Sequence, residues 1–209
     1  MANDQRRMLL LEVLLLGGIS AVLHQTGVFL LFFAVPVQLL AVKRGFASFM
    51  NAAMVSLGVI ALWKGVQIMR IAVPGGDTTL IMLDLLLPAG VLGGLAMINW
   101  LGKRSQPLQE WLKFAGGILL SAMVIVPMLL YVRQSELFLA VIEGHYSFLQ
   151  EQGLVDTVTF EQLFNQVLLM LMRSIGGFVA AMLLLNYYFG SGLGGDRNRL
   201  AKLQLPWWT

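Results

Sequence analysis

Two charged side chains, Asp84 and Arg173, stand inside long apolar stretches of the sequence. A charge at the centre of a bilayer costs about 2.5–3.5 kcal/mol on insertion scales, so such a residue suggests either a structural ion pair or a functional site. The depth of each residue along its helix predicts that Asp84 and Arg173 approach each other in the outer half of a helical bundle. They form either a structural ion pair, in which the two charges neutralise each other, or part of a polar pocket that binds a ligand.

Other polar residues would gather at the mouth of such a pocket. The candidates are Asn186, Gln166, Arg70, Asp77 and His24. A third charge, Glu12, lies near the inner end of its helix, where Arg6 or Arg7 can reach it. We therefore interpret Glu12 as structural.

The sequence lacks the motifs of most catalytic and metal sites. It has no cysteine, which excludes disulfides, iron–sulfur clusters and thiolate zinc sites, and its two histidines are too few for a His-rich metal site. No Walker-type GxxxxGK[ST], nucleophile elbow or HExxH occurs. Residues 190–195 match GxGxxG but follow a membrane helix rather than a strand, so they predict a flexible linker that ends the helix. We expect no catalytic residue, metal or cofactor.

Composition identifies the elements that must position these residues. Of 209 residues, 58% are hydrophobic and 12% are charged, and the mean hydropathy is +0.78. A soluble domain has about 25% charged residues. The chain is therefore predicted to be an all-α, polytopic integral membrane protein.

Six apolar stretches approach the roughly 20 residues that a membrane-spanning helix needs. They cover residues 8–23, 28–42, 46–63, 80–100, 112–131 and 160–189. The first two are separated only by a polar turn at 24–27, which predicts a tight helical hairpin. We expect one membrane domain over 1–209, with a tail at 190–209.

Lysine and arginine predict the orientation of these helices. With the N-terminus inside, ten basic residues face the cytoplasm and three face outward. The ten are Arg6, Arg7, Lys43, Arg44, Lys103, Arg104, Lys113, Arg197, Arg199 and Lys202, and the three are Lys64, Arg70 and Arg133. We expect a multi-pass protein of the bacterial cytoplasmic (inner) membrane with both termini in the cytoplasm. The net charge of +3 requires no nucleic-acid partner.

The longest loop, between the last two spans, contains its own helical pattern. Apolar residues recur at helical spacing over about 135–152, which predicts an amphipathic helix on the membrane or over the bundle. Leu137, Val141 and Phe148 are expected to face inward. This helix either gates a pocket or only covers the loop. Gly153 should end it, and Thr159 with Gln162 predicts a capping box at the start of the last span.

Small residues recur every four positions on most of the predicted spans, and such stripes let membrane helices approach closely. The pairs are Gly17/Ala21, Ser48/Ala52/Ser56, Gly90/Gly94, Gly117/Ser121, Gly176/Ala180 and Gly177/Ala181. The glycines of the fourth and sixth spans would bring those two helices together. Most pairs serve packing within the chain, and one could dock a partner.

Two segments carry a resemblance to a known family. The first runs from Phe33 to Gly45, with Pro36 near its start and Lys43-Arg44 at its end; the second is Leu205-Pro206-Trp207. The chain resembles the YybS-like bacterial membrane proteins, which are grouped with the substrate-binding (S) components of energy-coupling-factor transporters. The resemblance implies a six-helix S-component-like bundle. It also implies that Gly17 and Ala21 dock a coupling subunit, and that Asp84, Arg133 and Arg173 lie near a ligand.

Three functions follow as hypotheses. The first is an S-component-like protein that binds a small solute or lipid among its outer helix ends and depends on a separate ATPase module. The tentative ligand-binding residues are Asp84, Arg173, Arg133, Asn186 and Arg70. The second is a non-transporting membrane scaffold or assembly subunit similar to MreD. An integral-membrane enzyme is the third, although the sequence offers no catalytic constellation. The partners expected are the lipid bilayer, a membrane protein and a small-molecule ligand.

Overall fold

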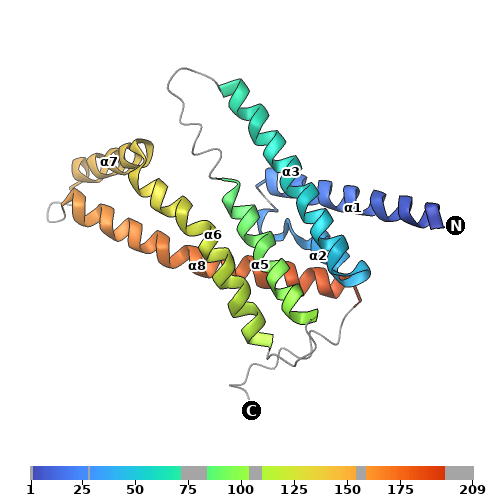
Figure 1. Ribbon diagram of the computed structural model, residues 1–209. Coiled ribbons are helices and arrows are strands. Elements are labelled where there is room, and N and C mark those ends of the chain that lie inside the picture. Colours follow the sequence, from blue (N-terminus) through green and yellow to red (C-terminus); the bar gives the residue numbers. More distant parts are fainter. Residues whose placement is uncertain (1, 28, 72–83, 104–109, 154–158, 196–209) are drawn as a thin grey trace, which may run out of the picture.

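The computed structural model describes residues 2–27, 29–71, 84–103, 110–153 and 159–195, and these residues form helices with no strand among them (Figure 1). The elements are α1 (Ala2–Gln25), the short 3-10 helix η1 (Leu30–Phe32), α2 (Val35–Arg44), α3 (Phe46–Ile71), α5 (Leu86–Lys103), α6 (Glu110–Gln134), α7 (Glu136–Glu151) and α8 (Phe160–Leu193). The N-terminal part of α1 extends away from the other helices, and α7 lies beside the end of α6 and the start of α8.

Five of these helices are long and apolar enough to cross a membrane. The qualifying stretches are Asp4–Gln25, Phe46–Met69, Leu86–Lys103, Glu110–Met128 and Phe160–Leu193. The all-helical fold class is confirmed, and five of the six expected spans correspond to such a helix.

The second expected span has a different form. In place of one helix over 28–42, the described residues contain η1 and the ten-residue α2. At 1.5 Å per residue, α2 is about 15 Å long, half the roughly 30 Å of a hydrocarbon core. Pro36 lies in its first turn, where a missing N–H costs little, and Gly45 ends it with φ +88°. α2 packs against α1, α3 and α8, and its Val37, Gln38 and Leu40 are buried.

The glycines of α5 pack mainly against α6, the next helix along the chain. A Cβ on Gly90 would lie 2.9 Å from Ile125, and one on Gly94 would lie 2.8 Å from the Gly117 carbonyl oxygen. The Ser121 hydroxyl donates a hydrogen bond to the Gly90 carbonyl at 2.8 Å. Gly176 and Gly177 of α8 are exposed, and a Cβ on either would have no neighbour within 4 Å. The expectation that the glycines of the fourth span (α5) would meet those of the sixth span (α8) is therefore wrong.

The glycine-rich segment at 190–195 continues α8 to Leu193 instead of forming the expected linker. A Cβ on Gly190 would lie 2.5 Å from Gln38, and one on Gly194 would lie 2.6 Å from Val42. The missing side chains let α2 pack closely against the end of α8. Gly195, with φ +86°, follows the helix as an end signal.

The amphipathic helix expected at about 135–152 is present as α7, and Gly153 follows it with φ +67°. Among its described side chains Ile142 is buried, whereas Val141 and Phe148, which were expected to face inward, are 59% and 58% exposed; the Leu137 side chain lies outside the described parts. The capping box is confirmed, since the Thr159 hydroxyl accepts from the Gln162 backbone N–H and the Gln162 side chain accepts from that of Thr159.

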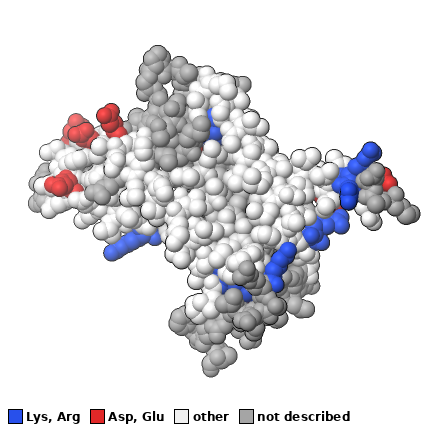
Figure 2. Space-filling view, in the orientation of Figure 1, with Lys and Arg blue, Asp and Glu red and all other residues white. Residues whose placement is uncertain are grey.

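Charged side chains are segregated on the visible face of the molecule (Figure 2). Acidic side chains gather over α7, and most of the visible basic ones lie from the N-terminal end of α1 toward the far end of α5. The middle of this face carries almost no charge, as expected of the part of a bundle that contacts hydrocarbon.

Candidate functional site

Asp84 forms an ion pair with Lys64 of α3 instead of with Arg173. The Lys64 Nζ lies 2.5 Å from the Asp84 Oδ2, and the Lys64 side chain is only 14% exposed. The expected Asp84–Arg173 pair is absent from the described ion pairs, and Arg173 is exposed on α8. The sequence assigned Lys64 to a loop, but α3 continues to Ile71, which places Lys64 on a helix beside Asp84.

His24, in the last turn of α1, is buried near this ion pair. Its side chain is 6% exposed, and its ring packs edge-on against Phe33 at 5.3 Å between centroids. Both ring nitrogens lack a hydrogen-bond partner. The charges of Asp84 and Lys64 act electrostatically on the ring. We call His24, Lys64 and Asp84 the His24 cluster.

The remaining predicted ligand-binding residues do not join this cluster among the described residues. Asn186 is buried on α8, where its Nδ2 donates to the carbonyl oxygens of Leu31 and Met182, each at 2.7 Å. It thus connects α8 to η1. The side chains of Arg70 and Arg133, and all of Asp77, lie outside what the structure describes.

Gly17 and Ala21, the tentative partner-docking pair, face α3 within the chain. Ala21 is fully buried, and a Cβ on Gly17 would lie 2.8 Å from the Ala52 carbonyl oxygen. The same two helices are joined by a hydrogen bond in which the Ser56 hydroxyl of α3 donates to the Ser20 hydroxyl of α1 at 3.1 Å. This face is closed, so the two residues hold α1 against α3 and are not open to a coupling subunit.

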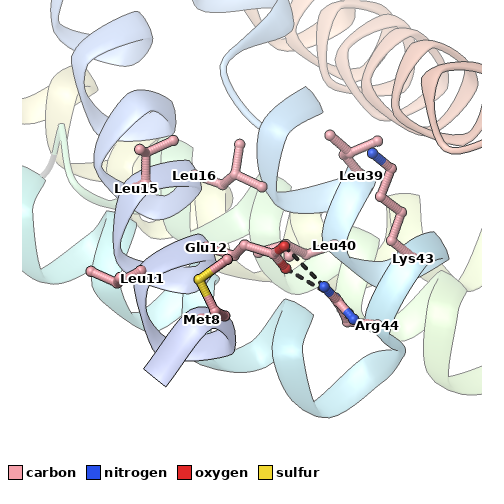
Figure 3. A pocket seen from close by; sticks show the side chains of 9 residues that line it. All are labelled: Met8, Leu11, Glu12, Leu15, Leu16, Leu39, Leu40, Lys43 and Arg44. Carbon is pink, nitrogen blue, oxygen red and sulfur yellow. Dashed lines mark hydrogen bonds and ion pairs between the residues drawn. The ribbon is translucent and has the colours of Figure 1, made fainter. Parts of the chain in front are cut away.

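A groove of about 680 Å³ lies between α1 and α2 (Figure 3). We call it the α1–α2 groove. Its apolar lining is Met8, Leu11, Leu15 and Leu16 of α1 and Leu39 and Leu40 of α2, and its charged lining is Glu12, Lys43 and Arg44. The volume falls in the range of about 300–1,000 Å³ that is usual for ligand sites.

Glu12 and Arg44 pair across this groove (Figure 3). The Arg44 Nε and Nη2 donate to the two carboxylate oxygens of Glu12, each at 2.9 Å. Hydrogen bonding to Glu12, reinforced by its negative charge, raises the pKa of Arg44. Arg6 or Arg7 was the expected partner of Glu12, but the end of α2 comes back beside α1 and brings Arg44 instead.

Gln38 is a buried polar residue that was not among the predicted site residues. Its side chain is fully buried and exchanges hydrogen bonds with Asn99 of α5, at 3.2 Å from Gln38 Nε2 to Asn99 Oδ1 and 2.8 Å from Asn99 Nδ2 to Gln38 Oε1. A glutamine in an apolar stretch was the available signal. Because both amides are paired, they connect α2 to α5 and are not free for a ligand.

The described residues contain no group of three or more His, Asp or Glu side chains that could hold a metal ion. The geometry defines the class of protein only broadly, as a helical protein with apolar helices fit to cross a membrane, a small polar cluster and a groove with charged residues at its edge. Comparison with models of known protein families, with curated proteins and with solved structures finds no match.

Proposed function

We propose that this chain is a non-catalytic binding subunit of the bacterial cytoplasmic membrane, similar to a transporter S component. Both termini lie in the cytoplasm, which is supported by ten basic residues on that side against three on the other. It takes a small polar solute at its outer helix ends, at the His24 cluster, to which the last turn of α1 contributes His24, α3 contributes Lys64 and the turn before α5 contributes Asp84.

The unpaired ring of His24 is the observation that carries this proposal. Leaving a buried donor or acceptor unsatisfied costs about 1–3 kcal/mol. Two buried amides of the core, Gln38 and Asn99, avoid that cost by pairing with each other, whereas both nitrogens of His24 are without a partner. A bound polar molecule would satisfy them.

The cluster also suggests the chemistry of the solute. Lys64 supplies an ammonium group, Asp84 a carboxylate and His24 an imidazole that donates at one nitrogen and accepts at the other. The nearby Gln25 adds a buried amide Nε2 that lacks a partner. These groups match a small molecule that has both donors and acceptors, such as a zwitterion.

Replacement of His24 by Phe tests the proposal. Phe keeps the edge-on packing against Phe33 and removes the two unpaired nitrogens. If His24 serves only the fold, the His24→Phe protein should be more stable and release the same small molecules. If it holds a solute, mass spectrometry of molecules released by denaturing the purified wild-type protein should detect a compound that His24→Phe lacks. Identical released molecules from both proteins would refute the proposal.

A second candidate is the non-transporting scaffold or assembly subunit, and the open face of α8 favours it. Gly176 and Gly177 are exposed there with no neighbour within 4 Å of a Cβ, and small residues let a second membrane helix approach closely. A protein that co-purifies with the wild type, and is lost from Gly177→Leu but retained by His24→Phe, would support the scaffold over the binding subunit.

A further inference from the structure

The α1–α2 groove opens away from the core of the bundle. Three residues of its α1 wall are largely exposed, Met8 at 63%, Leu11 at 61% and Leu15 at 60%. Leu40, on the α2 side, is 1% exposed and is part of the core. The groove therefore has a closed apolar floor and one open side, and this side belongs to a helix that is apolar enough to cross a membrane.

Charge is confined to three side chains of the groove. Glu12 neutralises Arg44 through two hydrogen bonds, and these bonds use only some of the five N–H donors of the guanidinium group. Lys43 has no ion pair among the described residues, and in Figure 3 no dashed line reaches its ammonium group. One uncompensated positive charge thus stands beside a series of leucines.

This combination selects a particular occupant. A polar solute would leave the leucine walls unfilled, and a purely apolar molecule would leave Lys43 without a counter-charge. Basic pockets between membrane helices on the cytoplasmic side bind anionic lipid headgroups, and the leucine walls offer an acyl chain surroundings as apolar as the lipid tails that it leaves. We propose that the α1–α2 groove binds one anionic phospholipid, whose phosphate contacts Lys43 and whose acyl chain lies along Leu11, Leu15 and Leu39. This lipid site is separate from the His24 cluster.

Competition between two lipids tests the proposal. The purified full chain is equilibrated in micelles that contain equal amounts of phosphatidylglycerol and phosphatidylcholine with identical acyl chains, and native mass spectrometry counts the lipids that stay bound. We expect one phosphatidylglycerol per chain, favoured about fivefold over phosphatidylcholine, the ratio that one lysine near an anionic headgroup supplies.

Four variants locate the site. Lys43→Gln replaces the ammonium group with a neutral and slightly shorter polar side chain, and should abolish the preference, whereas Lys43→Arg should retain it. Leu11→Trp should fill the groove and reduce retention of both lipids. Lys103→Gln is the matched control, because Lys103 is an exposed lysine outside the groove that lies over the Phe46 ring at 5.1 Å; it should behave as wild type.

The remaining outcomes overturn the proposal. Equal retention of the two lipids by the wild type would show that the groove has no charge selectivity, as would be seen if a helix of another protein filled it. An equal loss of preference in Lys43→Gln and Lys103→Gln would show only a diffuse attraction to basic residues. His24→Phe should leave lipid retention unchanged, so failure here and failure of the solute proposal are distinguishable.

Discussion

Buried polar side chains of this bundle fall into two groups according to whether they find a partner within the chain. Gln38 and Asn99 satisfy each other across α2 and α5, and Ser121 joins α6 to α5 through the Gly90 carbonyl. His24 finds no partner at either ring nitrogen. Since an unpaired polar group is costly in a low-dielectric interior, this contrast separates residues that connect helices from His24, for which we propose a bound solute.

The amide pair should behave as a coupled unit. Gln38→Leu or Asn99→Leu alone should destabilise the protein, because each leaves one buried amide without its partner. The double variant should cost less than the two single costs combined, by about 0.5–2 kcal/mol. Reversible unfolding of the four proteins in mixed micelles measures this coupling. Strictly additive effects would contradict the role of the pair in holding α2 to α5.

At this scale the sequence identified polar residues better than it identified their partners. Asp84 and Glu12 both stood out in apolar stretches and both form ion pairs, but with Lys64 and Arg44. The predicted partners of these acids were chosen by depth or by neighbouring position in the sequence. The real partners depend on how far α3 extends and on where α2 turns back, and neither follows from hydropathy.

Among the elements, α8 places its glycines in two different environments. Gly190 and Gly194 are in close contact with α2, whereas Gly176 and Gly177 face open space. The position of α8 could be predicted from its apolar stretch, and its capping box from Thr159 and Gln162. Both signals are local in the sequence. Which glycine faces a neighbour could not be predicted, since that depends on the rotation of each helix within the bundle.

Two alanine substitutions on α8 should therefore have opposite effects. Gly190→Ala places a Cβ 2.5 Å from Gln38, and should destabilise the protein by about 1–3 kcal/mol through overpacking. Gly176→Ala meets no atom within 4 Å, and should stabilise it by about 0.5–1 kcal/mol, because alanine loses less backbone entropy in a helix. Thermal unfolding of both proteins in the same detergent measures the difference. Equal effects would show that α2 does not pack on the end of α8.

For the whole molecule, acidic and basic side chains lie at different ends, and this distribution bears on how the helices are oriented in a membrane. Acidic side chains gather over α7, and most of the visible basic ones lie from the start of α1 toward the far end of α5 (Figure 2). Because cytoplasmic segments of membrane proteins are enriched in Lys and Arg, this distribution supports an orientation with α7 outside.

Labelling of single cysteines measures that orientation without interference, since the chain has none of its own. A cysteine at the exposed Ser147 of α7 should react with a membrane-impermeant maleimide on intact cells. Cysteines at Gln5 and Lys103, also exposed, should react only after permeabilisation. Reaction of the Gln5→Cys protein in intact cells would show that the orientation is the opposite of the predicted one.

The short α2 has a consequence for biosynthesis. With ten residues it is too short to cross a bilayer as an independent segment, and part of its surroundings is α8, which begins 116 positions after α2 ends. At about 5–20 residues per second, α8 is synthesised roughly 6–23 s later. During that interval the nascent chain holds an incompletely enclosed helix with Gln38 at its centre. Insertion of the last helix therefore completes a structure begun at the second, and a chain released before α8 should be a substrate for quality-control proteolysis.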